Sequence, residues 1–433
     1  MWRKEYCQYV LYHFNLYYTG VDNVVISHGL EGSLQVSNTG ISCFDSDDSA
    51  PSYKMIDGLP VLFAEDDKEL IEKTEAGIRV TADIISGIFF LLSGWQERGK
   101  TAADDRFYCR DSWQGSNGFE RYALVDSYFS ILAKAAELYT GNLIKKKLFS
   151  GKPVTVFLSH DIDKIFSGRL EGSFNVLKKG DVLKGIKGLL ASKDPWFNLD
   201  EIAQLEEEAG AKSTYFFLTK KGKVPEGINA DYDFNQAEVQ AQVEQIRQGN
   251  SEVALHGSLG SHRLKTQFNE EWKKLKGTSQ AFGNRFHYLK FNINKTVSVL
   301  ERSGVTYDAT MGFPDTIGFR NGTSFPFYLY NFEENRPAHF VSIPLHVMDT
   351  TLQHKKYLGL SPDMAGKDLN AIFTETKKWG GVFCLLWHNN YFSDYKFAGW
   401  RSVYAKFLAQ NKNVVSYTTA HELAKMMREI KEA

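Results

Sequence analysis

The stretch TVFLSHDID, from Thr155 to Asp163, decides the fold that the sequence predicts. Its apolar half ends at Leu158 and has the pattern of a buried β-strand, and polar residues follow at once. In α/β proteins the chemistry lies beyond the carboxyl ends of the strands. Asp161 and Asp163 are therefore candidates for a metal ligand and a general base, because two close carboxylates favour a divalent cation. Taken alone, the pair would more often be a helix cap and a solvated side chain.

Six further apolar runs follow, separated by amphipathic stretches of helical length, and this alternation indicates βα units. Together with the first run they predict seven parallel strands that end at or near Leu158, Leu218, Leu255, Tyr288, Tyr307, Leu345 and Trp387. Helices are expected at residues 199–209, 236–247, 268–282, 293–302, 369–379 and 419–430. We expect an α/β fold with a deformed or incomplete (β/α)7 barrel, with an open doubly wound sheet as the alternative.

The first 145 residues have a different pattern. Short β-like runs at 24–27 and 59–63 precede an apolar helical segment at 84–98, and few polar side chains fall at spacings that suggest chemistry. We therefore expect a smaller N-terminal α+β domain at residues 1–145 and the barrel at residues 146–433.

Composition excludes several classes of function. The 51 basic and 52 acidic side chains give a net charge of −1, without the basic surplus of a phosphate-binding protein, so we expect no nucleic-acid partner. The four cysteines show no C-x-x-C spacing, which argues against a disulfide framework or a zinc knuckle. The longest apolar stretch, 87–95, is about half of what a membrane span needs. With no signal-peptide pattern either, we expect a cytoplasmic protein without a membrane span.

Histidines are concentrated at the ends of the predicted strands. His256 directly follows an apolar run, a position that suits zinc or a similar metal, although a lone histidine there would more often be structural. His287 or His262 could complete a site with Asp163. We rank His287 slightly higher because it shares a strand face with Arg285, whereas the loop of His262 would have to curl back.

A third histidine suggests acid catalysis. His388 ends the apolar run VFCLLW, and imidazole titrates near neutral pH, so His388 is a candidate general acid. Arg285 and Asp308 would support the chemistry, the first by neutralising a catalytic carboxylate and the second by orienting an imidazole. A core histidine and surface ion pairs are the alternative interpretations.

The glycine-rich segment GFRNGTS, residues 318–324, lacks the spacing of a phosphate-binding loop. A polar lining of a substrate cleft and a plain loop remain equally good interpretations.

These strand-end residues resemble the motifs of the polysaccharide deacetylases of the NodB-homology type, carbohydrate esterase family 4 and its relatives. The matching segments are HDID at 160–163, ALHGSLGSH at 254–262, RFHY at 285–288, YDATMGF at 307–313 and LLWHN at 385–389. The resemblance covers roughly residues 150–433 and implies a deformed barrel with Asp161 as catalytic base, Asp163 as metal ligand and His388 as catalytic acid. The segment 83–98 resembles an accessory region that precedes this domain in some bacterial relatives.

Two departures from the family pattern affect the metal site. The family's adjacent aspartates are separated here by Ile162, although alternate residues of an extended chain point to the same side. The family's second histidine, four residues after the first, is replaced by Gly260. We therefore expect a site that is rebuilt with His262 or His287, or one that is weakened or lost.

The resemblance implies a metal-dependent hydrolase that removes the acetyl group from an N-acetylated sugar or glycan precursor, with zinc as the favoured divalent ion. An O-acetyl esterase or a non-sugar amidase would use the same residues. A non-catalytic glycan-binding or scaffold protein without its metal is the alternative from another class. A carbohydrate is the expected partner, and the sequence leaves the oligomeric state open.

Overall fold

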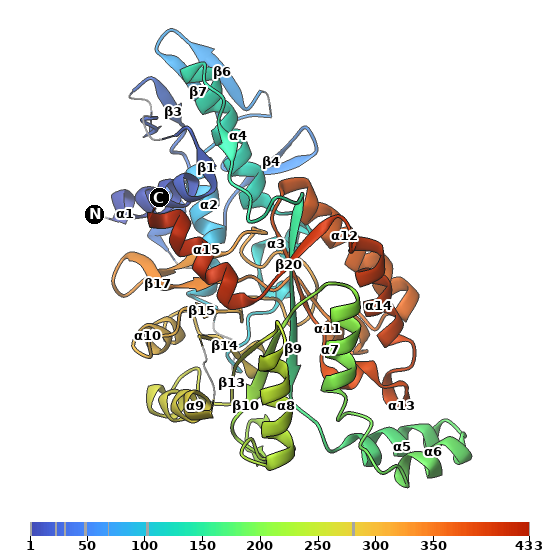
Figure 1. Ribbon diagram of the computed structural model, residues 1–433. Helices are drawn as coiled ribbons and strands as arrows, with labels where there is room; N and C mark the ends of the chain where they lie inside the picture. The colour runs from blue at the N-terminus through green and yellow to red at the C-terminus, as the bar shows by residue number, and fades with distance from the viewer. Residues whose placement is uncertain are drawn as a thin grey trace.

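The computed structural model describes residues 2–21, 24–29, 32–46, 50–67, 69–100, 104–278 and 282–432. Within them, the largest sheet has ten strands in the order β16-β17-β15-β14-β13-β10-β9-β19-β18, and β20 pairs with β9 beside this path (Figure 1). The strands are β9 (Val154–Ile162), β10 (Thr214–Leu218), β13 (Glu252–Gly257), β14 (Gly283–Phe286), β15 (Tyr307–Asp308), β16 (Phe327–Asn331), β17 (Arg336–Ser342), β18 (Val347–Met348), β19 (Val382–Leu386) and β20 (Val415–Thr418).

Strand β9 lies at the centre of this sheet. All nine of its residues are buried, and it pairs in parallel with β10, β19 and β20. A strand covered on both faces needs no alternation of polar and apolar residues, which explains the continuous apolar run of the sequence. Each of the seven predicted strands corresponds to a strand of this sheet.

The sheet differs from a closed seven-stranded barrel. It curls like half of a barrel, and among the described residues its end strands β16 and β18 do not pair with each other. β16 runs antiparallel to β17. The strand expected around Tyr288 ends at Phe286, because the chain there enters a short turn.

Helices cover the sheet between successive strands, as the alternating pattern predicts. They are α7 (Leu199–Glu208), α8 (Ala237–Gln248), α9 (Lys265–Thr278), α10 (Thr296–Glu301), α11 (Asp349–Gln353), α12 (Pro362–Trp379), α13 (Asp394–Phe397), α14 (Trp400–Asn411) and α15 (Ala420–Glu432). The sequence sets the ends of α12 clearly. Ser361 accepts a hydrogen bond from the Met364 amide, Pro362 occupies the first turn, and Gly380 ends the helix with a φ of 67°.

Residues before β9 form helices and small sheets. The helices are α1 (Trp2–Tyr17), α2 (Ile84–Leu92), α3 (Trp113–Asn117) and α4 (Leu124–Thr140), and the strands are β1 (Tyr18–Thr19), β2 (Ser27–His28), β3 (Leu34–Val36), β4 (Tyr53–Ile56), β5 (Leu59–Leu62), β6 (Ile71–Thr74), β7 (Gly77–Val80) and β8 (Lys145–Lys146). Helix α2 is buried along its whole length, as the apolar segment predicts, and it stops before Gly94, whose φ is 75°.

The N-terminal region and the large sheet share one apolar core, which extends from Tyr6 in α1 to Met427 in α15. Figure 1 shows α1 and α15 close together, with the two chain ends near each other. Buried polar contacts cross between the regions: the Tyr9 hydroxyl donates to the Tyr328 carbonyl, and Arg320 pairs with Glu97. The predicted domain boundary at residue 145 stays a prediction.

In the part of the chain that the structure describes, none of the helices combines the length and apolar character needed to cross a membrane.

Candidate metal centre

The end of β9 presents two aspartates to one side of the sheet. The imidazole of His256 lies 3.6 Å from Asp161 and 3.3 Å from Asp163, so alternate residues of this strand do point the same way. His160, immediately before Asp161, points to the opposite side, where its ring contacts the Trp387 carbonyl at 2.6 Å and Glu206 at 2.9 Å. Because Ile162 separates the two aspartates along an extended chain, both carboxylates point to the same side of the sheet.

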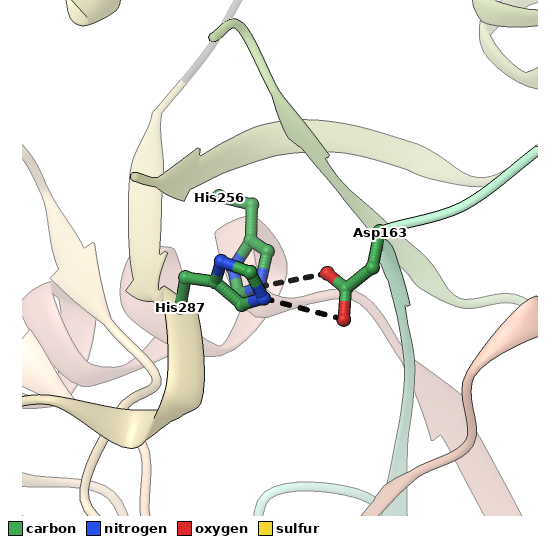
Figure 2. A group of neighbouring side chains, drawn as sticks. All are labelled: Asp163, His256 and His287. Atoms are coloured by element: carbon green, nitrogen blue, oxygen red, sulfur yellow. Dashed lines mark ion pairs between the residues drawn. The ribbon is translucent and has the colours of Figure 1, made fainter. Parts of the chain in front are cut away.

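Three strand ends bring a compact set of donor atoms together. Asp163, His256 and His287 each offer one ligand atom, and these atoms lie within 4.8 Å of one another. Figure 2 shows the two imidazoles facing the carboxylate of Asp163, with Nε2 of His256 3.3 Å and Nε2 of His287 3.4 Å from its oxygens. Two imidazole nitrogens and one carboxylate oxygen suit a zinc-like divalent ion.

His256 is oriented for such a role by its other ring nitrogen. Nδ1 lies 2.8 Å from the Arg285 carbonyl, which can only accept, so Nδ1 carries the proton and Nε2 faces the cluster with its lone pair. Burial lowers the pKa of His256, but the charges of Asp161 and Asp163 outweigh burial and raise it. A cation at the cluster would compete with a proton for Nε2.

His287 is turned toward Asp163 by a tight bend. The two residues that follow it, Tyr288 and Leu289, have φ angles of 59° and 55°, a left-handed conformation that side chains other than glycine rarely adopt. Burial lowers the pKa of His287 and favours the neutral, metal-binding form. Burial raises the pKa of Asp163, but His287 and, to a smaller extent, His256 outweigh burial and hold that pKa well below its usual range.

Asp161 is held by an arginine from β14. Arg285 Nη1 donates to Asp161 at 2.9 Å and to the Ser159 hydroxyl at 2.9 Å, while its Nε donates to the Ala309 carbonyl. Burial raises the pKa of Asp161, but His256 and then Arg285 outweigh burial and lower it. Asp161 is therefore an ionised carboxylate at the edge of the cluster, able to accept a proton.

His388 is held by an aspartate from α11. Its Nδ1 donates to Asp349 at 2.7 Å, and its Nε2 lies 3.7 Å from Asp163. Burial lowers the pKa of His388, but Asp349 more than compensates and raises it to about 10. The ring therefore carries a proton on the side of the metal cluster, although a bound cation would oppose this rise.

Two residues that the sequence proposed lie elsewhere. Nε2 of His262 contacts Asp105 of the N-terminal region at 2.8 Å, because the chain turns away at Gly260, whose φ is 90°. His262 thus lies outside the donor cluster, whose third member is His287.

Asp308 likewise orients no imidazole. It accepts hydrogen bonds from Asn284 and Thr310, and burial raises its pKa to about 6. The histidine-orienting carboxylate is Asp349, which follows β18. Its position at a strand end was the only sequence signal that could have identified it.

The cluster opens into a cavity of about 110 Å³. Besides the site residues, its walls include Arg106, Tyr288, Leu289, Pro314, Met348, Thr350 and Tyr357. Arg106 comes from the N-terminal region and lies within 3.3 Å of the Tyr357 hydroxyl. No local motif marked Arg106, since only the packing of the two regions brings it here.

The glycine-rich segment does not line this cavity. Arg320, Thr323 and Ser324 instead bind Glu97 and Asp126 of the N-terminal region. These contacts join the loop to the N-terminal region.

Comparisons with known proteins give only distant similarities. A model described as a family of unknown function, DUF7033, matches residues 21–138. No curated protein matches. Among solved structures, a Mycobacterium smegmatis protein assigned as a polysaccharide deacetylase is 16% identical, with a TM-score of 0.44 over 65% of this chain and 92% of its own.

Two further solved structures give similar values. Puue allantoinase is 13% identical, with a TM-score of 0.43 over 64% of this chain and 91% of its own. A Pseudomonas aeruginosa PAO1 protein assigned as a polysaccharide deacetylase is 10% identical, with a TM-score of 0.43 over 64% and 92%. Similarity at this level does not transfer an activity, so the chemistry must come from the residues of the site itself.

Proposed function

We propose that this protein is a metal-dependent hydrolase that removes the acetyl group from an N-acetylated sugar or glycan precursor. One observation carries the proposal. The Asp163–His256–His287 donor set opens into the same cavity as an arginine-bound carboxylate, Asp161, and an aspartate-bound imidazole, His388. A metal site, a base and an acid in one cavity are the parts that hydrolysis of an amide requires.

The residues present fit a divalent ion. Oδ1 of Asp163 is buried without a hydrogen-bond partner, and Nε2 of His256 and Nε2 of His287 both face this carboxylate. A buried polar atom normally has a partner, so this carboxylate oxygen supports a ligand at the cluster. When bound there, a zinc-like ion supplies a water of lowered pKa and polarises the acyl carbonyl.

The protein's own groups then divide the proton transfers. Asp161 accepts the proton of the attacking water, because Arg285 keeps that carboxylate ionised. His388 holds a proton at Nε2 as well as at Nδ1, because the negative charge of Asp349 beside Nδ1 favours the doubly protonated ring. It can deliver that proton to the departing amine, which would otherwise leave as a poor anion.

The size of the cavity supports an acetyl group as the moiety that is removed. Pockets for whole drug-sized ligands measure about 300–1,000 Å³, and this one measures about 110 Å³. A small acyl group would enter it, with the remainder of the substrate at the rim beside Arg106, Tyr288 and Tyr357. Aromatic rings beside a charged donor offer both an apolar face and hydrogen bonds to a sugar.

Acetate release from N-acetylated oligosaccharides tests this proposal, with the wild type and Asp161→Asn measured with and without a chelator. We expect release only by the metal-loaded wild type. Equal release in all arms would refute the mechanism. Parallel arms with O-acetylated sugars and non-sugar amides distinguish the three hydrolase substrates, which the same residues could attack.

A further inference from the structure

A helical hairpin projects from the body close to the metal site. Helices α5 (Gly168–Lys178) and α6 (Val182–Leu189) follow Asp163 in the chain and precede α7. Figure 1 shows the pair extending away from the sheet at the lower right, near the end toward which β9 runs. Lys164 and Lys396 pair with Glu171 and tie the base of the hairpin to the body.

The inner face of the hairpin is made of small residues. The buried positions of α5 are Gly168, Gly172, Ser173 and Val176, and those of α6 are Gly185 and Gly188. A Cβ at Gly172 would meet Tyr395 at 2.9 Å, and one at Gly188 would meet the Ser173 hydroxyl at 2.3 Å. Close packing therefore requires glycine here, and the bulky side chains are directed elsewhere.

The large apolar side chains of the hairpin are exposed instead. Leu183 is 84%, Leu190 79% and Leu170 70% exposed, which is the reverse of an ordinary amphipathic helix in a globular protein. The exposed set is Leu170, Phe174, Val182, Leu183, Ile186, Leu189 and Leu190. Single exposed leucines are common, but a contiguous group on one element marks an interaction surface.

Basic residues border this apolar group. Between residues 168 and 190 the sequence has five basic side chains, Arg169, Lys178, Lys179, Lys184 and Lys187, against the acidic Glu171 and Asp181. Glu171 is already paired with lysines, and Asp181 caps α6. The hairpin is therefore strongly positive in a chain whose net charge is −1.

We propose that the α5–α6 hairpin docks this protein on an anionic membrane surface. Exposed leucine and phenylalanine side chains flanked by lysines are the combination by which interfacial helices bind anionic lipid headgroups and the outer acyl region. A second copy of this chain fits less well, because it would bring the same lysines together. The inference is independent of the proposed hydrolysis, and its test measures binding alone.

Vesicle co-sedimentation of the full chain tests the docking. We expect binding to vesicles of phosphatidylcholine mixed with phosphatidylglycerol, little binding to pure phosphatidylcholine, and weakening by salt. The substitutions Lys178→Gln, Lys179→Gln, Lys184→Gln and Lys187→Gln together should weaken binding at least about tenfold. The triple change Leu170→Ser, Phe174→Ser and Leu183→Ser should do the same, with the fold intact because all three side chains are exposed.

Matched variants outside the hairpin control for general loss of charge or apolar surface. These are Leu143→Ser with Leu264→Ser, both exposed, and Lys265→Gln, Lys273→Gln, Lys276→Gln and Lys367→Gln together, and we expect wild-type binding from each. Absence of binding by folded wild type, equal binding to both vesicle types, or equal losses in hairpin and control variants would overturn the proposal. A concentration-dependent dimer that the hairpin variants abolish, without vesicle binding, would assign the surface to a second copy instead.

Discussion

The metal centre and the contact between the N-terminal region and the sheet both bury charged side chains, but they partner them differently. At the contact, Arg320 binds Glu97 through two nitrogens, at 2.9 and 2.6 Å, and donates to the Gly312 carbonyl. Both oxygens of Asp126 accept hydrogen bonds from Thr323 and Ser324. Every charge there has its partner within the protein.

At the metal centre the partners are incomplete. Oδ1 of Asp163, Nδ1 of His287 and Nη2 of Arg285 are buried without hydrogen bonds. Buried polar groups left unpaired are costly, and these atoms have no partner within the described part of the chain. The difference separates two uses of buried charge: one joins parts of the protein, and the other leaves polar atoms open to a ligand, as the proposed function requires.

The largest expected effect distinguishes two buried aspartates at strand ends. Asp349→Asn should lower turnover by about 10²–10⁴-fold, because His388 loses the carboxylate that orients it and holds its proton. Asp308→Asn should leave turnover per folded molecule near the wild-type value, since Asp308 contacts no imidazole of the site. Acetate release, normalised to folded protein by circular dichroism, measures both. Equal losses would return Asp308 to the catalytic set.

The second prediction concerns stability rather than activity. Arg320→Ala should lower the free energy of unfolding by about 3–5 kcal/mol, because it leaves Glu97 buried and unpaired. Arg302→Ala removes an exposed ion pair with Glu333 and should cost at most about 1 kcal/mol. Urea unfolding measures both values, and losses of similar size would contradict the role given to the contact.

The third prediction compares two histidines that the sequence left as rivals. His287→Ala should weaken zinc binding by at least about a hundredfold, because it removes a donor from the cluster. His262→Ala should leave zinc affinity unchanged, since its imidazole contacts Asp105 instead. Competition with a chromophoric chelator measures the affinities. A larger loss with His262→Ala would show that the donor set is wrong.

The fourth prediction concerns the pH dependence of stability at Glu252, a buried carboxylate whose hydrogen-bond partners are neutral. Glu252 accepts hydrogen bonds from Tyr307, Thr214 and the His421 amide, and burial raises its pKa from 4.5 to about 7. A raised folded-state pKa means that its contribution is full below pH 4.5 and is lost as pH rises through about 7. Glu252→Gln should therefore gain stability over the wild type between pH 5 and pH 8, by at most about 3 kcal/mol.

Urea unfolding at several pH values measures this gain. A difference between Glu252→Gln and the wild type that stays constant with pH would mean that Glu252 does not titrate in this range.

The smallest expected effect concerns Arg106, the residue by which the N-terminal region contributes to the cavity. Arg106→Ala should raise KM by about two- to tenfold, the equivalent of one hydrogen bond, with zinc content unchanged. Arg110→Ala is the matched control, because its side chain is exposed and does not line the cavity. Steady-state kinetics on the N-acetylated substrate measures both. A fall in turnover without a change in KM would place Arg106 in the chemistry instead.

Local sequence predicted much of the fold. The seven apolar runs became strands, because fully buried parallel strands need continuous apolar residues. Helices α7, α8 and α15 also match their predicted segments closely, whereas α12 begins seven residues before its predicted start at residue 369. The antiparallel β16 and the early end of β14 were not predicted, since pairing partners and left-handed turns are set by distant contacts.

The sequence by itself determined which residues stand at the strand ends, because apolar runs and the alternation of side chains along a strand are local properties. It therefore placed Asp161, Asp163, His256 and His388 at those ends, where the structure also has them. The sequence ranked His287 only slightly above His262, and only the tertiary structure brings His287 into the donor cluster and places Asp349, instead of Asp308, beside His388. Those choices depend on which loops bend and which strands become neighbours, and packing across the whole chain fixes both.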